Sequence, residues 1–227
     1  MLVDSNEFDV LVIGPNDIDR FETVTGSKHF ETAHVIGFSL GAMAAIEIAA
    51  KYPQLSKKLS LIAPAAPLEL GDFLPDMAGR PVFRAAQQGA IMFRLFTFLQ
   101  NLGFRLAPEK LIQSMFSESP AADRKLLEDP NFQATLIDGL RSSLGKNSSA
   151  YQSSVRRYVK PWAEKLKTIR CPVTLHHGDE DNWAPISMSH ALAYQIRSSV
   201  DLVTYPKLGH YSTLYETLPT ILKEDLS

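Results

Sequence analysis

Cysteine is almost absent from this sequence. Cys171 is the single one among 227 residues, so no intrachain disulfide is expected. It precedes a proline and an apolar run, which favours a buried strand residue over a nucleophile. An excess of charge of one sign is also lacking, because 23 basic and 25 acidic residues give a formal net charge of −2. No basic stripe is present either, so we expect no nucleic-acid partner and no attraction to an anionic membrane.

Long apolar runs are missing as well. The most apolar stretch, Ala90–Leu106, contains Arg94 and Arg105 and is a poor candidate for a membrane span. The first residues lack the basic start and apolar core of a signal peptide, so we expect a cytoplasmic location. No His, Cys and carboxylate residues have metal-ligand spacing, and no glycine-rich phosphate loop follows the first expected strand. We therefore expect no metal and no cofactor, and a nucleotide-binding domain is disfavoured.

Five short apolar runs, bounded by glycine and proline, are typical of strands covered on both faces. They are Phe8–Ile13, Ala33–Gly37, Lys58–Ala63, Pro172–His176 and Asp201–Tyr205. Helical patterns at Ala42–Lys51 and Ser187–Arg197 fall between these runs. This alternation predicts an α/β fold, with a mostly parallel sheet and helices on both faces.

The stretch from Pro67 to Lys160 breaks the alternation, because it has no clear strand. Its helical segments are Ala90–Leu106, Asp123–Leu127, Phe132–Ser142 and Tyr151–Val159. We therefore predict an α/β core made of residues 1–66 and 161–227, with residues 67–160 as a helical insertion. Ala90–Leu106 is apolar on almost every side, so we expect this helix to bury two faces.

The most informative motif is the G-x-S-x-G pattern at Gly37–Gly41. A buried strand runs into it and an Ala-rich helix follows at once, which is the context of a nucleophile elbow. Glycines on either side of the serine allow the neighbouring backbone to approach closely. The N-terminus of the helix favours negative charge at the site. Ser39 is therefore the candidate nucleophile, and the backbone N–H of Leu40 is a candidate oxyanion donor.

With this motif the chain resembles the α/β-hydrolase superfamily, in which the acid and the base follow the nucleophile along the chain. Val173–Pro185 resembles the strand and G-x-x-D-x-x-x-P loop of the family, with Asp181 at the acid position and Asp179 as a rival. Leu202–His210 resembles the last strand and its Gly-His loop. The resemblance implies that His210 is the base and that Asp181 orients it.

The resemblance also implies a reaction and the place of the insertion. Ser39 would attack an ester or related acyl bond and form an acyl-enzyme, which water then releases. Insertions at this point of the chain lie over the active site in the family, so residues 67–160 are expected to form a lid. Its apolar side chains would favour a small, apolar substrate. The expected pocket residues are Phe93, Phe96, Leu99 and Trp183.

The N-terminal part departs from the family pattern. The family has about three further strands and a His-Gly oxyanion loop before the elbow, whereas here only Phe8–Ile13 fits a strand and no His-Gly pair precedes Ser39. This run matches either the strand before the D-x-x-G-x-G-x-S loop of the family, with Asp17 and Asp19 in place of glycines, or the strand beside the elbow. In the second alignment Pro15, which has no N–H, falls near the donor position.

The missing loop leaves two hypotheses open. The chain is a serine hydrolase, or it is a hydrolase-like binding protein with little or no turnover, because losing one oxyanion donor costs ~10²–10³ in rate. The N-terminal shortening is explained either by a truncated gene product or by the loss of the first strands in this member. The intact Ser, Asp and His order favours the enzyme. The sequence does not indicate an oligomeric state.

Overall fold

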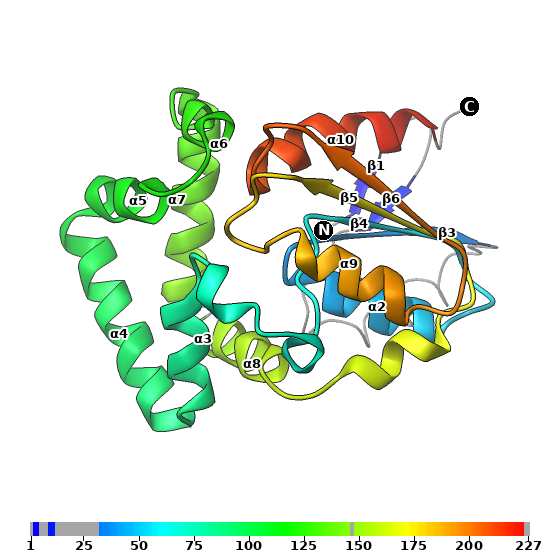
Figure 1. The fold of residues 1–227 in the computed structure, drawn as a ribbon. Coiled ribbons are helices and arrows are strands. Elements are labelled where there is room, and N and C mark those ends of the chain that lie inside the picture. The colour runs from blue at the N-terminus through cyan, green and yellow to red at the C-terminus, as the bar shows by residue number, and fades with distance from the viewer. Residues whose placement is uncertain (1, 5–8, 12–31, 146–147, 225–227) are drawn as a thin grey trace.

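The computed structural model describes residues 2–4, 9–11, 32–145 and 148–224. Its centre is a four-stranded parallel sheet in the order β3-β4-β5-β6 (Figure 1). The strands are β3 (Ala33–Phe38), β4 (Ser56–Ile62), β5 (Val173–Gly178) and β6 (Val200–Tyr205). The α/β class and the mostly parallel sheet predicted from the sequence are confirmed.

Helices cover both faces of this sheet. Helices α2 (Gly41–Lys51) and α9 (Ser187–Gln195) lie on one face, and α10 (His210–Glu224) lies on the other (Figure 1). The short helix η3 (Ala163–Thr168) leads into β5. Helix α2 and the central strands are apolar and fully buried at many positions, which makes them the centre of the core.

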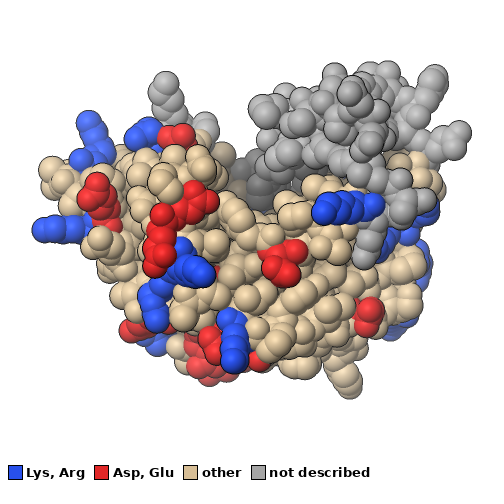
Figure 2. Space-filling model, turned by 90° about the horizontal axis from the view of Figure 1, so that it is seen from above, with Lys and Arg blue, Asp and Glu red and all other residues tan. Residues whose placement is uncertain are grey.

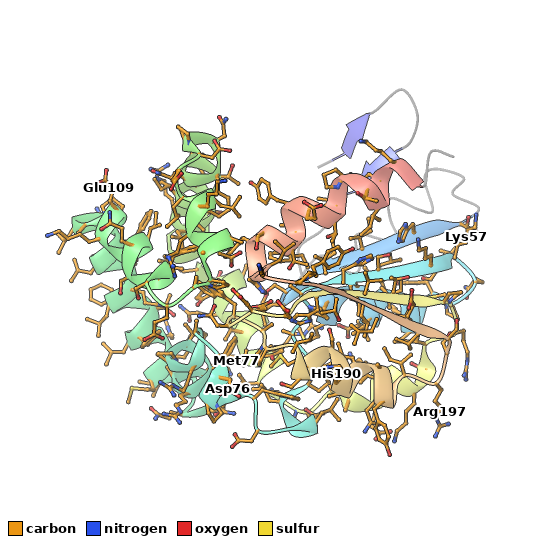
Figure 3. All side chains as sticks on the ribbon, turned by 45° about the horizontal axis from the view of Figure 1, so that its top comes forward. Lys57, Asp76, Met77, Glu109, His190 and Arg197 are labelled. Carbon is orange, nitrogen blue, oxygen red and sulfur yellow. The ribbon has the colours of Figure 1, made fainter. Side chains whose placement is uncertain are left out.

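Residues 67–160 form a helical segment at one end of the sheet (Figure 1). Its elements are η1 (Leu68–Leu70), η2 (Leu74–Asp76), α3 (Arg80–Gln87), α4 (Ala90–Leu106), α5 (Pro108–Phe116), α6 (Ala121–Leu126), α7 (Pro130–Leu144) and α8 (Ser148–Tyr158). In Figure 3, Lys57 marks the beginning of β4, and Glu109 of α5 lies on the opposite side of the molecule. The carboxyl ends of the parallel strands therefore face the helical segment.

The N-terminal strand differs from the expectation. Strand β2 (Asp9–Leu11) pairs antiparallel with β1 (Leu2–Asp4) in a separate two-stranded sheet. A strand is thus present in the described part of Phe8–Ile13, as predicted, but its expected place in the parallel sheet is wrong. An apolar run alone does not reveal its pairing partner, because parallel and antiparallel strands have similar side-chain patterns over a few residues. Pro15, Asp17 and Asp19, on which the two family alignments depend, lie outside the described residues.

Helix α4 has the predicted bounds but not the predicted burial. Phe93, Thr97 and Phe104 are buried, whereas Ile91 is 87% exposed and Phe98 is 61% exposed. The expectation of two buried faces is wrong, because α4 lies at the outer edge of the helical segment and has neighbouring helices on one side only (Figure 1). No helix among the described residues has the length and apolarity that a membrane span requires.

Charges of both signs are interspersed on the face shown in Figure 2, with wide uncharged areas between them. The described part of this face therefore has no extended patch of one sign, in keeping with the small net charge.

Candidate active site

Ser39 lies in the turn between β3 and α2. Its φ angle is 54°, a left-handed conformation that costs energy in a residue with a side chain and that occurs often at functional sites. The Ser39 N–H donates to the carbonyl of Ile62, and the Ser39 carbonyl accepts from Ala42 and Ala65. These bonds hold the turn from both sides and fix the serine at the carboxyl edge of the sheet.

Gly37 and Gly41, the two glycines of the G-x-S-x-G pattern, differ in how closely other atoms approach them. A Cβ atom at Gly37 would lie 2.7 Å from the Ala45 Cβ and 2.9 Å from the Ala42 Cα, so α2 packs directly on the Gly37 backbone. A Cβ atom at Gly41 would meet nothing within 4 Å. Close helix–strand packing therefore requires the first glycine, and the helix start at Gly41 has room for a side chain.

We predict that Gly37→Ala lowers the free energy of unfolding by ~1–3 kcal/mol, the usual cost of overpacking a core. Gly41→Ala is the matched control and should be neutral or stabilising by ~0.5–1 kcal/mol, since alanine is the better helix former. Urea denaturation of both variants measures the difference. Equal stabilities would contradict the packing argument.

The structure brings Ser39, His210 and Asp181 together, although they are far apart in the sequence. The Ser39 Oγ lies 2.8 Å from the His210 Nε2, and the His210 Nδ1 lies 2.7 Å from the Asp181 Oδ2. An ionised carboxylate only accepts hydrogen bonds, so Nδ1 carries the proton and Nε2 accepts from the serine hydroxyl. This tautomer is the one that a general base needs.

Both carboxylate oxygens of Asp181 accept hydrogen bonds. Its Oδ1 accepts from the backbone N–H groups of Trp183 (2.8 Å) and Ala184 (3.0 Å). Burial by itself would raise the pKa of Asp181, but the charge and hydrogen bonds of His210 and His177 outweigh it and hold the pKa well below its usual range. The carboxylate therefore remains ionised throughout the neutral pH range.

His177 lies beside the candidate acid, and the motifs of the sequence did not single it out. It is fully buried, and its Nε2 lies 2.7 Å from the Ala184 carbonyl and 3.4 Å from the Asp181 Oδ2. Its Nδ1 lies 2.6 Å from the Ser189 Oγ. Its position directly before the Gly178 of the acid loop was the available signal, but the pattern alone did not distinguish it from His176.

Leu40, the candidate oxyanion donor, is the residue before the first turn of α2, where backbone N–H groups lack acceptors inside the helix. It follows the candidate nucleophile directly, as the elbow geometry requires. Pro15, which falls near the position of a second donor in one alignment, lies outside the described residues. Among the described residues, no group of three or more His, Cys, Asp or Glu side chains is placed to hold a metal ion.

Aromatic rings surround His210 on several sides. The Phe38 ring centroid lies 4.8 Å from that of His210, Tyr211 lies at 5.3 Å, and Trp183 is stacked at 6.2 Å. Phe116 of α5 joins them, with centroids 5.3 Å from Tyr211 and 5.7 Å from Trp183. Burial, together with Asp123 and Asp181, raises the pKa of Tyr211 to about 12, so its hydroxyl stays neutral. The side of the site next to His210 is therefore apolar and uncharged except for the carboxylates.

The four expected pocket residues are placed differently. Trp183 contacts the His210 ring. Phe93 is fully buried and faces Tyr151 of α8 at 5.9 Å, Phe96 packs on the main core, and Leu99 is 55% exposed. No ring contact or hydrogen bond within the described part of the chain joins these three residues to the candidate triad. Their role in a pocket stays a prediction.

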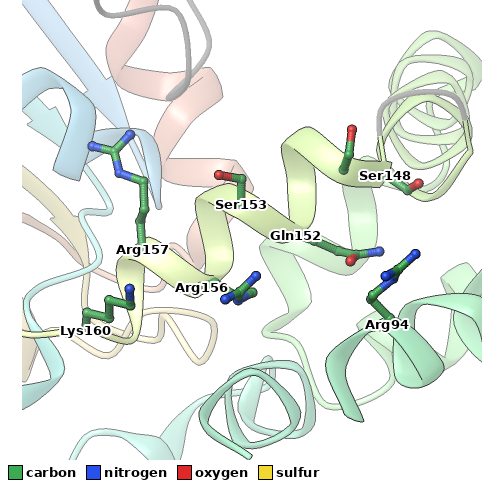
Figure 4. A pocket seen from close by; sticks show the side chains of 8 residues that line it. Arg94, Ser148, Gln152, Ser153, Arg156, Arg157 and Lys160 are labelled. Carbon is green, nitrogen blue, oxygen red and sulfur yellow. The ribbon is translucent and has the colours of Figure 1, made fainter. Parts of the chain in front are cut away.

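A hollow of about 450 Å³ lies elsewhere, between α4 and α8 (Figure 4). Its lining includes Arg94, Arg156, Arg157 and Lys160, and none of the described residues that line it is acidic. Ser39, Asp181 and His210 do not line it, so it is separate from the candidate active site.

Comparison with solved structures gives matches to α/β-hydrolase enzymes. An esterase from Exiguobacterium antarcticum matches with a TM-score of 0.62 and 15% identity, over 92% of this chain and 72% of that one. A serine hydrolase from Cycloclasticus zankles matches with a TM-score of 0.60 and 16% identity, over 92% and 70%. An α/β-fold hydrolase from Bacillus anthracis str. Sterne matches with a TM-score of 0.60 and 15% identity, over 96% and 78%.

A search of curated proteins finds no match. The model of one protein family, described as serine aminopeptidase, S33, matches residues 7–217, which is most of the chain. This match agrees with the parallel sheet and with the enzymes of similar fold. The chain therefore belongs to this hydrolase family, within the α/β-hydrolase superfamily.

Proposed function

We propose that the protein is a serine hydrolase that cleaves an ester or related acyl bond through an acyl-enzyme. The observation that carries the proposal is the continuous hydrogen-bond chain from the Ser39 Oγ through His210 to Asp181. It begins at a serine held with a positive φ at the carboxyl edge of the sheet. Membership of a hydrolase family and the fold shared with an esterase support the same class of reaction.

Each group has one role in the proposed reaction. His210 takes the hydroxyl proton as the Ser39 Oγ attacks the carbonyl carbon, and the Leu40 N–H stabilises the oxyanion that forms. His210 then gives the proton to the leaving group, which leaves Ser39 acylated. A water molecule, deprotonated by His210, releases the acid and restores the serine. Asp181 stays ionised throughout and stabilises the imidazolium.

The surroundings favour a small, apolar acyl or aryl substrate. Phe38, Trp183 and Tyr211 lie around the base, and α5 and α7 each bring a further ring, Phe116 and Phe132, against Tyr211. We propose that the helical segment acts as a lid, because Asp123 of this segment contacts His210 and its Phe116 and Phe132 contact the neighbouring Tyr211. An aromatic wall excludes water and stabilises apolar groups of a substrate.

A panel of p-nitrophenyl esters of increasing chain length tests this proposal. Trp183→Ala should raise the KM of the longer esters by ~10–100-fold, the equivalent of about 1.5–3 kcal/mol for a buried aromatic side chain. Phe93→Ala is the matched control. It should leave the chain-length preference unchanged while lowering the free energy of unfolding by ~3–5 kcal/mol, because Phe93 is fully buried in the main hydrophobic core.

Three other results have distinct meanings. A changed preference in Phe93→Ala, Phe96→Ala or Leu99→Ala would show that α4 lines the pocket after all. An unchanged chain-length preference in Trp183→Ala would contradict the proposal that the aromatic rings around His210 bind the substrate. No turnover of any ester by the unmodified protein, together with no covalent reaction at Ser39, would favour a hydrolase-like binding protein.

A further inference from the structure

Helix α10 begins at His210, so the candidate base lies in the first turn of a helix. The first N–H groups of a helix have no acceptors within it. Here the acceptor for these N–H groups is the carboxylate of Asp123, which belongs to the helical segment and precedes His210 by 87 residues. Its Oδ2 accepts from the N–H groups of His210 (2.9 Å) and Tyr211 (3.3 Å), and its Oδ1 accepts from the N–H of Ser212 (2.8 Å).

The side chain of Ser212 completes this arrangement. Its hydroxyl donates to the Asp123 Oδ1 at 2.6 Å and accepts from the Gly209 N–H at 2.7 Å. Asp123 has no exposed surface, and it is the single buried residue of α6. All four hydrogen bonds of the buried carboxylate are thus used to hold the turn that carries His210.

Gly209 permits this approach. A Cβ atom at this position would lie 2.7 Å from the Asp123 Cγ and 2.5 Å from the Pro120 Cγ. A glycine is therefore required directly before the candidate base, because the helical segment packs on the Gly209 backbone. A larger residue would push Asp123 away from the first turn of α10.

The same stretch of the helical segment also holds the acid loop. The Trp183 Nε1 donates to the Ser119 Oγ at 3.1 Å, and the Asn182 Nδ2 donates to the Glu118 carbonyl at 2.9 Å. Residues 118–123 therefore bridge the loop after Asp181 and the turn at His210. This short stretch of the chain therefore holds both the loop of the Asp181 carboxylate and the turn of the His210 ring, which must be aligned with each other.

We propose that Asp123 is a positioning residue for the candidate base. The hydrogen bonds that the Asp123 carboxylate accepts from the backbone of α10 hold the His210 Nε2 at 2.8 Å from the Ser39 Oγ. Its negative charge also offsets the partial positive charge of the α10 N-terminus, which opposes the positive charge that His210 gains in the reaction. This inference rests on the proposed function, since it assigns Asp123 a part in the same site.

Asp123→Ala tests the proposal, and Asp129→Ala is the matched control. Asp129 also accepts a backbone N–H, that of Asn131 at 2.8 Å, at the start of α7 in the same helical segment, but it does not contact His210. Asp123→Ala should lower kcat by ~10²-fold with KM little changed, because a small displacement of a catalytic group has this effect. Asp129→Ala should leave kcat unchanged. Asp123→Asn, which keeps one acceptor oxygen, should lie between Asp123→Ala and the unmodified protein.

Amide hydrogen exchange provides a readout that does not depend on activity. Asp123→Ala should speed exchange at His210, Tyr211 and Ser212, whereas the β-sheet amides should keep their protection. If Asp123→Ala does not fold, the same two measurements on Asp123→Asn decide the question.

The outcomes separate this inference from the proposed function. An unmodified protein that neither hydrolyses esters nor reacts covalently at Ser39 would overturn the proposed function. An active protein whose Asp123 variants keep full kcat would overturn the positioning role alone. A loss of kcat with faster exchange throughout the chain would also contradict it, because general unfolding would then be the cause.

Discussion

Replacing Ser39 by alanine should lower ester turnover by about 10⁶-fold, the usual loss when the nucleophile of a triad is removed. The Ser39 hydroxyl is the group that His210 activates at 2.8 Å. Ser189, which is linked to Asp181 through His177, is fully buried and therefore out of reach of a substrate. The fold should be retained, because the hydrogen bonds of the turn use the Ser39 backbone and not its side chain. Initial rates with p-nitrophenyl acetate and a thermal unfolding curve measure both effects.

Ser117→Ala is the matched control for this substitution. Ser117 is an exposed serine whose hydroxyl donates to the Ser114 carbonyl, so its loss should leave turnover unchanged. Turnover that persists in Ser39→Ala would show that another residue is the nucleophile.

Asp181→Asn should reduce turnover by ~10³–10⁴, since an amide facing Nδ1 favours the wrong tautomer of His210. Asp179→Asn is the control, two residues away in the same loop. The Asp179 carboxylate is exposed and accepts from the Lys207 N–H at 2.7 Å, so its loss affects a surface turn and should change the rate little. Steady-state kinetics of the two purified variants makes the comparison. The reverse ranking would place the acid at Asp179.

The carboxyl edge of the sheet was predictable from the sequence because its signals are local. The strand, the tight turn and the helix around Ser39 follow each other within Ala33–Lys51, and each has its own residue pattern. The loops of Asp181 and His210 likewise follow their strands directly. In a parallel sheet, residues just after neighbouring strands meet at one edge, so three separate motifs predict one place.

The contacts from the helical segment were not predictable in this way. Asp123 occurs in an ordinary acidic and basic stretch, and nothing near it in the sequence indicates that its partners are the first N–H groups of α10. Phe116 and Phe132 face Tyr211 for the same non-local reason. The burial of α4 was mispredicted because apolarity does not show how many neighbours a helix has. Long-range packing decides such features, and the residue pattern of a single segment carries no information about that packing.

The central claim is that Ser39 is an activated nucleophile, and covalent labelling tests it most directly. The protein is treated with a fluorophosphonate probe, digested, and analysed by mass spectrometry to locate the adduct. The account predicts a single adduct on Ser39, formed slowly or not at all in His210→Ala. An adduct on another residue, or no reaction of the folded, unmodified protein, would contradict it.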